Sequence, residues 1–500
     1  MAEGSDAYFA EHRESGDLGR MALRGGIVSV AMQYGNGILQ ILAAAVLARL
    51  LTPGDFGLVA IVTVLTSFAS LLIDFGLGDV TTQRNKITPS QISSLFWISS
   101  GVGFAVAVAV AAASPLIAAV YRQPELEPIA LCTSITFVLW GLSNQHLALL
   151  RRTMQFGRIA RILLLGSLVG IATSIALAWA GFGYWALVAR PIANGGCVVV
   201  GAWLGCRWWP GRPTFDAETR SMIRFGLHVV GFSVTYTVAR SLDRIALGLF
   251  YRPDQVGYYQ NAITLYESSI LQTLSQVHTV GSAALSKLQA NVAALRQKYQ
   301  SALSALAFFV MPAAAILSVT AEDVTAILLG EKWRPAGALL RILALRGIPQ
   351  VVEGSQGWLH LAIGRPDRWR NWGFVSFGVQ LVAVLAGLRF GTTGVAVACV
   401  IATVLLAIPS INYAGRPIGV GSAVVLRAVG PQLIGAICAA AGGSWLQMTL
   451  LAHSSSLVRV VLSASVCACI YLGVVVGVFR LTEPMRVARS VVQGRLRGSR

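Results

Sequence analysis

Residues 24–71 read RGGIVSVAMQYGNGILQILAAAVLARLLTPGDFGLVAIVTVLTSFASL. The stretch contains two apolar runs that flank a single turn, PGDFG at 53–57. Proline presets the geometry of such a turn, and glycine allows the backbone to open the helix that follows. Each run has about 20 residues, which is enough for an α-helix to cross a hydrocarbon core of roughly 30 Å. The stretch is therefore predicted to form a transmembrane helical hairpin.

Similar apolar runs recur along the whole chain. Its 500 residues are 55% hydrophobic and only 12% charged, with a mean hydropathy of +0.67, whereas soluble domains carry about 25% charged residues. We predict an all-α integral membrane protein with about fourteen transmembrane helices, each long enough to span the bilayer. The predicted spans are 26–48, 57–78, 92–119, 129–150, 161–180, 184–205, 225–250, 257–284, 301–320, 337–362, 371–388, 391–411, 427–448 and 457–478.

The arginines and lysines set the predicted orientation. Residues 1–24 are polar and lack a basic segment followed by an apolar core, so we expect a cytoplasmic tail and not a cleaved signal. With alternating helices, most of the 39 Lys and Arg then fall on the cytoplasmic side, and both termini lie there. This asymmetry explains the net charge of +18 without a nucleic-acid partner. The basic clusters either serve topology and solvation or bind anionic membrane lipids.

The chain also repeats itself, because residues 24–71 align with 224–271 without a gap. The second copy carries the turn PDQVG at 253–257 in place of PGDFG. Six predicted spans separate the two starts, so both copies have the same orientation and are related by an axis along the membrane normal. That arrangement favours a transporter with a site at the interface of the copies. A structural duplication without a transport path is the alternative.

Polar residues form a stripe on one face of each repeat copy. In the first span, Gln33, Asn36 and Gln40 follow each other at steps of three and four, as residues on one helix face do. In the seventh span, Asp243 and Arg244 follow Arg240 at i+3 and i+4, so these three residues also share one helix face. The repeat aligns Gln40 with Arg240. Both stripes are therefore expected to face the interface between the copies.

Further polar residues fall in the eighth and tenth spans. In the second half of the chain, four intramembrane arginines stand against three acids, and such residues usually mark a water-filled path for a substrate or ion. Internal pairing, for example of Asp243 with Arg240, is the alternative. Arg190 is a weaker candidate because it stands alone in the sixth span. The residues added by the eighth and tenth spans are Glu267, Gln272, Gln276, Arg341, Arg346 and Glu353.

These residue types suit an anionic, sugar-bearing cargo. The arginine fork matches phosphate oxygens, so the surplus formed by Arg240, Arg244, Arg341 and Arg346 suits a lipid-linked pyrophosphate. The amides of Gln33, Asn36, Gln40, Gln272 and Gln276 suit sugar hydroxyls. Asp243, Glu267 and Glu353 are the candidates for coupling transport to a proton or sodium gradient. No GxxxxGK[ST] motif and no CxxC spacing occur, so we expect neither a nucleotide nor a metal cofactor, and no catalytic residue.

Five stretches of the sequence resemble the bacterial polysaccharide transporters. They are LARLLTPGDFGLVAI at 47–61, LIDFGLGDVTTQ at 72–83, LLRRTMQFGRIA at 149–160, LGEKWRPAGALLRILAL at 329–345 and LAIGRPDRW at 361–369. In order and spacing they are similar to the Wzx-type flippases for undecaprenyl-pyrophosphate-linked repeat units. The resemblance is strongest to the branch with the colanic acid and succinoglycan exporters, within the multidrug, oligosaccharidyl-lipid and polysaccharide exporter superfamily.

This resemblance implies two six-helix lobes around a central cavity that opens alternately to each side, plus two extra helices. The implied parts are a tail at 1–24, an N-lobe at 25–212, a C-lobe at 213–415, extra helices at 416–479 and a basic tail at 480–500. It also implies a flippase of the bacterial inner membrane, for exopolysaccharide, O-antigen or capsule assembly. A polysaccharide polymerase and other assembly proteins are the expected partners.

Two other function classes compete with this interpretation. A membrane glycosyltransferase or ligase would need carboxylates in an extracytoplasmic loop, and the most acidic outer loop, TAEDVTAILLGEKWRPAG at 320–337, has no DxD pair. An ion-coupled drug exporter of the same fold would favour an acidic cavity, which the arginine surplus disfavours. The lipid II flippases carry a strongly cationic first lobe. The first span of this chain has the amides Gln33, Asn36 and Gln40 instead, which disfavours that identity.

Overall fold

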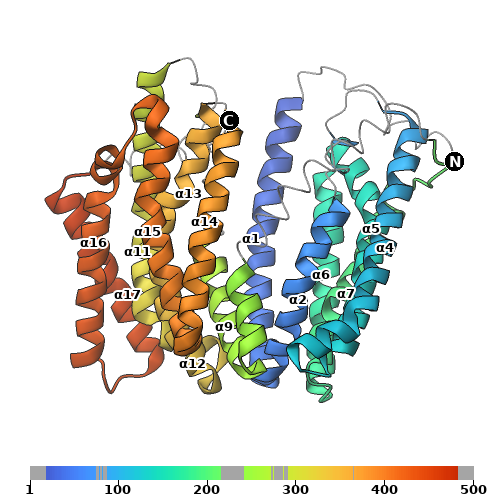
Figure 1. Ribbon diagram of the computed structural model, residues 1–500, viewed down its shortest axis with the longest axis horizontal. Coiled ribbons are helices and arrows are strands. Elements are labelled where there is room, and N and C mark those ends of the chain that lie inside the picture. The colour runs from blue at the N-terminus through green and yellow to red at the C-terminus, as the bar shows by residue number, and fades with distance from the viewer. Residues whose placement is uncertain are drawn as a thin grey trace. The chain divides into compact units, whose positions relative to one another are not determined.

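The computed structural model describes residues 18–74, 78, 81–82, 87–214, 241–271, 274, 285, 291–363 and 365–481. Within these ranges the regular structure is helical and contains no β-strand, which confirms the predicted all-α class. The chain divides into two compact units, Met1–Gly257 and Tyr258–Arg500 (Figure 1). The predicted lobe boundary at 212/213 adjoins residues 215–240, which lie outside the described ranges, so the domain limits remain a prediction.

Unit 1 is built from pairs of helices that are consecutive in the sequence. The strongest pairings join α4 to α5 and α6 to α7, and α1 packs against α6. The helices are α1 (Leu18–Leu50), α2 (Pro53–Asp74), α4 (Pro89–Tyr121), α5 (Leu126–Arg152), α6 (Phe156–Trp179) and α7 (Trp185–Cys206), and residues 241–250 are also helical.

Unit 2 is arranged around the long helix α11, which contacts α12, α13, α16 and α17. α9 begins in unit 1 and runs into unit 2, where a π-helical turn, η2, continues it. The helices are α9 (Pro253–Tyr266), η2 (Glu267–Leu271), α11 (Val292–Leu329), η3 (Glu331–Trp333), α12 (Arg334–Leu345), α13 (Gly347–Ala362), α14 (Pro366–Gly387), η4 (Leu388–Phe390), α15 (Gly391–Gly415), η5 (Arg416–Ile418), α16 (Ser422–Thr449), α17 (Ser456–Leu472) and η6 (Gly473–Val478).

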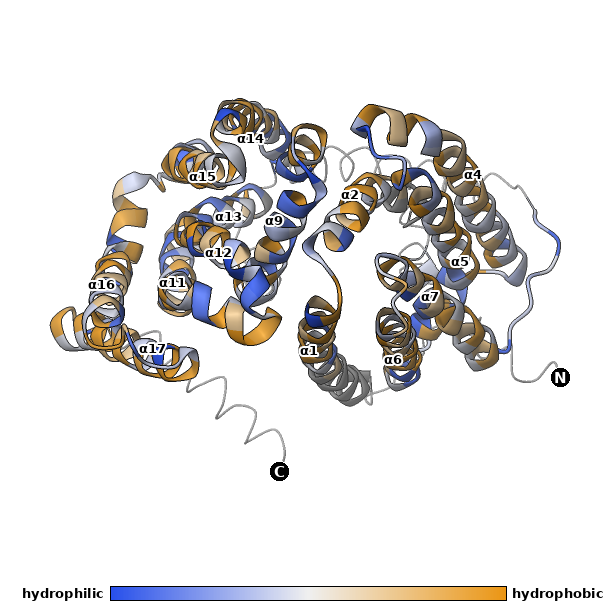
Figure 2. Ribbon diagram, turned by 90° about the horizontal axis from the view of Figure 1, so that it is seen from below, coloured by the Kyte–Doolittle hydropathy of each residue, from blue (hydrophilic) through white to orange (hydrophobic). Residues whose placement is uncertain are grey.

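Eight helical stretches of the described chain are long and apolar enough to cross a membrane. Figure 2 colours much of the helical ribbon as hydrophobic residues. Many large apolar side chains are exposed, as expected where lipid replaces water as the solvent. The protein is therefore a multi-pass membrane protein. The full count of fourteen spans remains a prediction, because parts of the seventh and eighth predicted spans are not described.

The predicted span at 337–362 is broken into α12 and α13 at Arg346. Pro349 lies in the first turn of α13 and has no backbone N–H, and its ring clashes with the carbonyl four residues earlier in a continuous helix. Gly347 adds close packing, since a Cβ there would meet Ile270 of η2 and Ala314 of α11 at 3.0 and 3.1 Å. The break places Arg346 at a helix junction.

The turn PGDFG begins α2 by a local capping arrangement. The backbone N–H and hydroxyl of Thr52 both donate to a carboxylate oxygen of Asp55, at 2.8 and 2.7 Å, and the Asp55 N–H donates back to the Thr52 hydroxyl at 3.3 Å. Pro53 occupies the first helical position, where no N–H is needed. The sequence Thr-Pro-Gly-Asp thus stops α1 and starts α2 within a few residues.

The two Pro-x-x-x-Gly motifs of the repeat contact each other within unit 1. A Cβ on Gly57 would lie 1.8 Å from the carbonyl oxygen of Pro253, and a Cβ on Gly257 would lie 1.9 Å from that of Pro53. The contact is therefore reciprocal, as expected for equivalent positions of two repeat copies. Only glycine allows such a close approach of two backbones.

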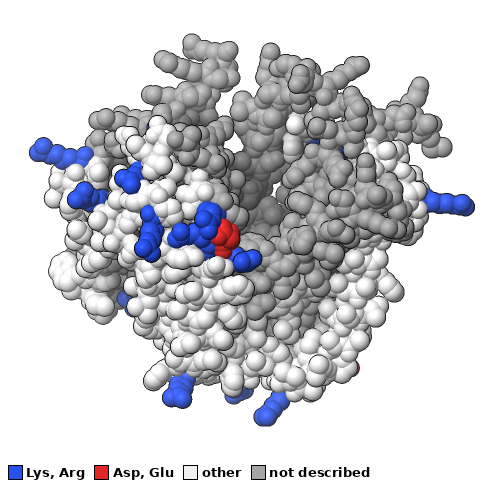
Figure 3. All heavy atoms as spheres, turned by 45° about the horizontal axis from the view of Figure 1, so that its top comes forward, with Lys and Arg blue, Asp and Glu red and all other residues white. Residues whose placement is uncertain are grey.

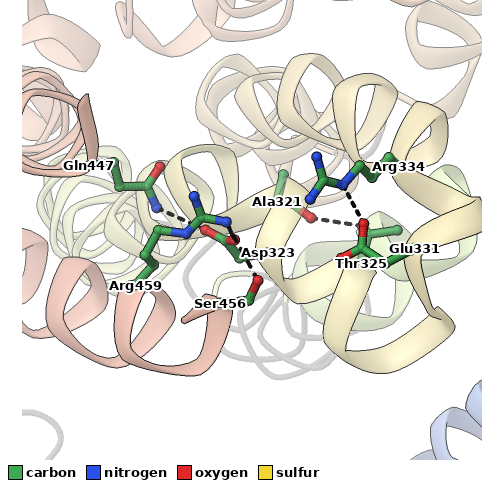
Figure 4. Close-up of polar contacts among 8 residues, drawn as sticks. All are labelled: Ala321, Asp323, Thr325, Glu331, Arg334, Gln447, Ser456 and Arg459. Atoms are coloured by element: carbon green, nitrogen blue, oxygen red, sulfur yellow. Dashed lines mark hydrogen bonds and ion pairs between the residues drawn. The ribbon is translucent and has the colours of Figure 1, made fainter. Parts of the chain in front are cut away.

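A buried ion pair holds α17 against α11. The Arg459 guanidinium lies 2.5 Å from an Asp323 carboxylate oxygen, and Gln447 of α16 donates to the other oxygen at 3.5 Å (Figure 4). The Asp323 side chain is 7% exposed and that of Arg459 is 27% exposed. The sequence at 320–329 was expected to be an outer loop, but it forms the end of α11 because its Ala, Val, Ile and Leu residues continue the helix.

We expect Gly57→Ala to destabilise the protein, because the new methyl group would overlap a carbonyl oxygen of the Pro253 backbone. Its melting temperature in detergent should fall by several degrees. Gly35→Ala is the matched control in α1, since nothing lies within 4 Å of a Cβ there, and it should melt like the parent protein. Equal melting temperatures of the two variants would contradict the close contact.

We expect Asp323→Ala to lower the melting temperature more than Glu322→Ala. The first change leaves Arg459 without its carboxylate and costs about 2 to 3 kcal/mol, somewhat below the loss for fully buried pairs because Arg459 keeps some exposure. Glu322 is 54% exposed and its pair with Arg341 contributes little. Thermal unfolding in detergent measures both. A larger effect of Glu322→Ala would overturn the role given to Asp323.

Candidate functional site

Arg244 and Asp243 lie on the helix of residues 241–250 in unit 1. Asp243 is buried, and one of its oxygens accepts the Arg244 backbone N–H at 2.8 Å. The Arg244 guanidinium donates to the Ser241 hydroxyl at 3.4 Å, and its Nε is buried without a hydrogen-bond partner. Arg240 lies outside the described residues. The part of the predicted cluster that is described therefore brings Arg244 and Asp243 together and leaves the guanidinium incompletely bonded.

The polar stripe of the first predicted span lies on α1. Gln40 accepts a hydrogen bond from the guanidinium of Arg190 on α7. Asn36, one turn earlier, is half-buried, and its side-chain oxygen has no hydrogen-bond partner. The side chain of Gln33 lies outside the description. Sequence reasoning missed the contact of Gln40 with Arg190, because a distance of 150 residues along the chain gives no periodic signal.

Arg346 sits at the break between α12 and α13 and points to α15. Its Nε donates to the hydroxyl of Thr403 at 3.1 Å. That hydroxyl donates its own hydrogen to the Cys399 carbonyl at 2.8 Å, so its oxygen is fixed as an acceptor. The side chain of Arg346 is half-buried. The helix break thus presents a fixed, partly accessible guanidinium between α12 and α13, inside the span that the sequence predicts at 337–362.

The other two acids predicted for ion coupling, Glu267 and Glu353, lie on two different helical segments of unit 2. Glu353 is half-buried on α13 and accepts a hydrogen bond from Gln350 at 3.2 Å, one turn away. Glu267 is the first residue of η2 and is also half-buried. Single π-helical turns are rare and frequently occur at functional sites. Gln272 and Gln276 lie outside the described residues.

Arg341 belongs to a different polar group from Arg346. It lies 3.4 Å from Glu322 of α11, and its carbonyl accepts the hydroxyl of Ser318 at 2.9 Å. A cavity of about 150 Å³ adjoins it, between α11, α12, α16 and α17. The cavity is lined by Val319, Glu322, Asp323, Ala326, Arg334, Arg341, Gln447 and Arg459. Two carboxylates, Glu322 and Asp323, offset part of the charge of the three arginines here.

Three of the motifs that carry the family resemblance hold turns between helices. In LLRRTMQFGRIA, Arg158 donates to Gln155 at 2.6 Å and to the carbonyl of Gly205 at 3.0 Å. In LGEKWRPAGALLRILAL, Arg334 pairs with Glu331 at 2.5 Å. These contacts give the motifs a structural function.

In the third motif, LAIGRPDRW, Arg365 pairs with Asp367 at 2.9 Å, and this carboxylate raises the pKa of the Arg365 guanidinium. The Arg368 guanidinium stacks 4.5 Å above the Tyr413 ring and so fixes the start of α14 to the end of α15. The motif LAIGRPDRW therefore also connects helix ends.

Exposed charged groups cluster on the face that Figure 3 turns forward, where basic atoms outnumber acidic ones.

The described residues contain no group of three His, Cys, Asp or Glu side chains that could hold a metal ion, and all seven cysteines are free. What they offer instead is hydrogen-bonding and cationic groups inside apolar helices. Such an arrangement can bind an anionic, hydroxyl-rich molecule reversibly. It offers no constellation of nucleophile and base among the residues singled out above.

The likeness to known proteins covers most of the chain. The lipopolysaccharide biosynthesis protein WzxC of Escherichia coli (strain K12) is 25% identical over 400 residues, which are 78% of this chain and 80% of that protein. The succinoglycan biosynthesis transport protein ExoT of Rhizobium meliloti (strain 1021) is 21% identical over 318 residues, 63% of this chain and 64% of that protein. These relatives lie in the branch that the sequence motifs predicted.

A solved structure also shares the fold. The lipid II flippase MurJ in an inward closed conformation superposes with a TM-score of 0.67 at 14% identity, over 89% of this chain and 98% of that one. The family model described as polysaccharide biosynthesis protein matches residues 46–338. Because this match spans more than half of the chain, the protein belongs to the polysaccharide biosynthesis protein family.

Proposed function

We propose that the protein is a flippase for undecaprenyl-pyrophosphate-linked oligosaccharide repeat units. It moves them from the cytoplasmic to the periplasmic leaflet of a bacterial inner membrane by alternating access, for exopolysaccharide, O-antigen or capsule assembly. Family membership and relatives named for lipopolysaccharide biosynthesis and succinoglycan transport support this proposal. The fold shared with a lipid II flippase supports a transporter and not an enzyme.

The observation that carries the proposal is the presence of guanidinium groups inside the membrane helices of both units. Arg244 in unit 1 and Arg346 in unit 2 are half-buried, and each donates to a neutral hydroxyl. A membrane arginine costs several kcal/mol, so it persists where it lines a wet path or meets an anion. Pyrophosphate oxygens fit the guanidinium fork. We assign the pyrophosphate to Arg240, Arg244 and Arg346, with Arg341 weakened as a ligand by Glu322.

The neutral amides of the first and eighth predicted spans serve the sugar part of the cargo in this proposal. Gln33, Asn36, Gln40, Gln272 and Gln276 offer donors and acceptors that match hydroxyl groups. The half-buried Asn36 oxygen without a partner supports such a role. A cation-exporting drug transporter would gain nothing from the arginine surplus, so we place it second.

In the proposed orientation both termini are cytoplasmic. The excess of Lys and Arg on that side supports it through the positive-inside rule. The cargo then enters at the face where lipid-linked oligosaccharides are built and leaves where a polysaccharide polymerase acts. Surrounding membrane lipids, the polymerase and other assembly proteins are the proposed partners.

We further propose that a proton or sodium gradient drives export through Asp243, Glu267 and Glu353. Asp243 is buried beside Arg244, so a change in its charge would alter how strongly that guanidinium attracts the cargo. Glu267 lies in a π-helical turn, a feature that frequently occurs at functional sites. Glu353 lies on α13, the helix that follows the break at Arg346.

In a strain that lacks its chromosomal copy of the gene, the protein should restore polysaccharide export. Arg244→Ala combined with Arg346→Ala should reduce export at least 10-fold, because each lost charge-assisted contact costs about 1.5 to 3 kcal/mol. The exported polymer is measured together with the amount of protein in the membrane. Arg389→Ala, at an exposed site in η4, is the control. Full export by the double variant at a normal protein level would refute the pyrophosphate assignment.

The coupling proposal predicts a specific loss in the triple variant Asp243→Asn, Glu267→Gln and Glu353→Gln. In vesicles, an imposed proton or sodium gradient should accelerate export by the parent protein and have no effect on this variant. An acceleration of the same size in both proteins would exclude these three acids as the coupling groups.

A further inference from the structure

Arg190 of α7 is a membrane arginine whose charge is not balanced by a carboxylate within the described part of the chain. Its guanidinium donates to the neutral side-chain oxygen of Gln40, and it forms no ion pair with a residue that the structure describes. Arg341, in contrast, lies beside Glu322. An arginine inside a membrane helix is costly unless it meets water or an anion. The Arg190 guanidinium is therefore suited to bind an anion.

The side chain of Arg190 is held in place but keeps free donors. Gln40 fixes one amino group, and a Cβ on Gly170 of α6 would lie only 2.8 Å from the Arg190 carbonyl, so the backbone is closely packed as well. The side chain is half-buried, and none of its nitrogens is a buried atom without a partner. The remaining N–H groups therefore reach accessible surface. A fixed guanidinium with free donors is preorganised for phosphate.

The repeat gives this pair a counterpart. Gln40 aligns with Arg240, one of the arginines that the sequence assigns to the pyrophosphate. Arg240 itself lies outside the described residues. At Gln40 the guanidinium comes from α7 instead, so an arginine accompanies this aligned position in unit 1 as well.

We propose that Arg190, positioned by Gln40, is a further binding residue for the phosphate groups of the lipid-linked cargo. The inference rests on the proposed flippase function and extends it to a residue of α7. Gln40 is then a positioning residue for Arg190 and not only a partner for sugar hydroxyls. The shared chemistry is a lipid phosphate, which either the polyprenyl carrier or a bulk anionic phospholipid can supply.

A purely structural role makes a different prediction, and the substitution Gln40→Glu separates the two. This substitution keeps the size and shape of the side chain at position 40 and replaces its amide by a carboxylate that pairs with Arg190. A structural link between α1 and α7 would become stronger. A binding residue would be neutralised, and affinity for phosphate would fall. Gln155→Glu is the matched control, because Gln155 accepts a hydrogen bond from Arg158 at 2.6 Å on an exposed helix start.

The experiment measures the binding of undecaprenyl pyrophosphate and of phosphatidylglycerol to the full-length protein purified in detergent. Gln40→Glu and Arg190→Gln should each weaken undecaprenyl pyrophosphate binding about 10- to 100-fold, as expected for the loss of charge-assisted hydrogen bonds. Gln155→Glu and Arg161→Gln, which changes an exposed arginine bonded to its own helix, should bind like the parent. Melting temperatures show that each variant is folded, and Gln40→Glu should melt at or above the parent.

The outcomes separate this inference from the function on which it rests. Parent-like binding and export by both variants would overturn the role of Arg190 and leave the flippase proposal intact. An equal loss of phosphatidylglycerol binding would assign the site to bulk lipid and overturn its role in cargo binding. A parent protein that binds no undecaprenyl pyrophosphate would refute the proposed function first, and the inference with it.

Discussion

The membrane interior cannot hydrogen-bond a polar group, and this constraint governs both the backbone and the charges of the protein. The backbone meets it by forming helices throughout the described ranges. The side chains meet it through specific partners, such as Thr403 for Arg346, Gln40 for Arg190 and Asp323 for Arg459. Where a carboxylate is the partner, the pair holds helices together. Where a neutral group is the partner, as Gln40 is for Arg190, the pair itself leaves the charge of the guanidinium uncompensated.

Close backbone contacts set the geometry around these charges. Gly57 approaches the backbone of Pro253, and Gly257 approaches the backbone of Pro53. The two turns that are equivalent in the sequence repeat therefore pack directly against each other. The break before Pro349 orients Arg346, and the tight packing at Gly170 fixes Arg190. Small residues and prolines, and not the charged residues themselves, therefore decide where the guanidinium groups are presented.

Much of the fold could be predicted from the sequence, because helix length and hydropathy are local properties. The hairpin at PGDFG and the repeat at PDQVG were visible in the same way. The site was harder to predict. Arg341 and Arg346 contact different helices, α11 and α15, and the pairs formed by Gln40 with Arg190 and Asp323 with Arg459 join residues more than a hundred positions apart. No single-sequence periodicity reports such contacts.

The central claim is that the protein carries an anionic lipid-linked oligosaccharide across the bilayer. The most direct measurement reconstitutes the purified protein in liposomes that contain an undecaprenyl-pyrophosphate-linked oligosaccharide, and follows how much of the sugar reaches a membrane-impermeant lectin outside. We predict that the accessible fraction rises with time from that of one leaflet towards that of both, and that Arg244→Ala slows the rise. An accessible fraction that stays at the level of protein-free liposomes would contradict the claim.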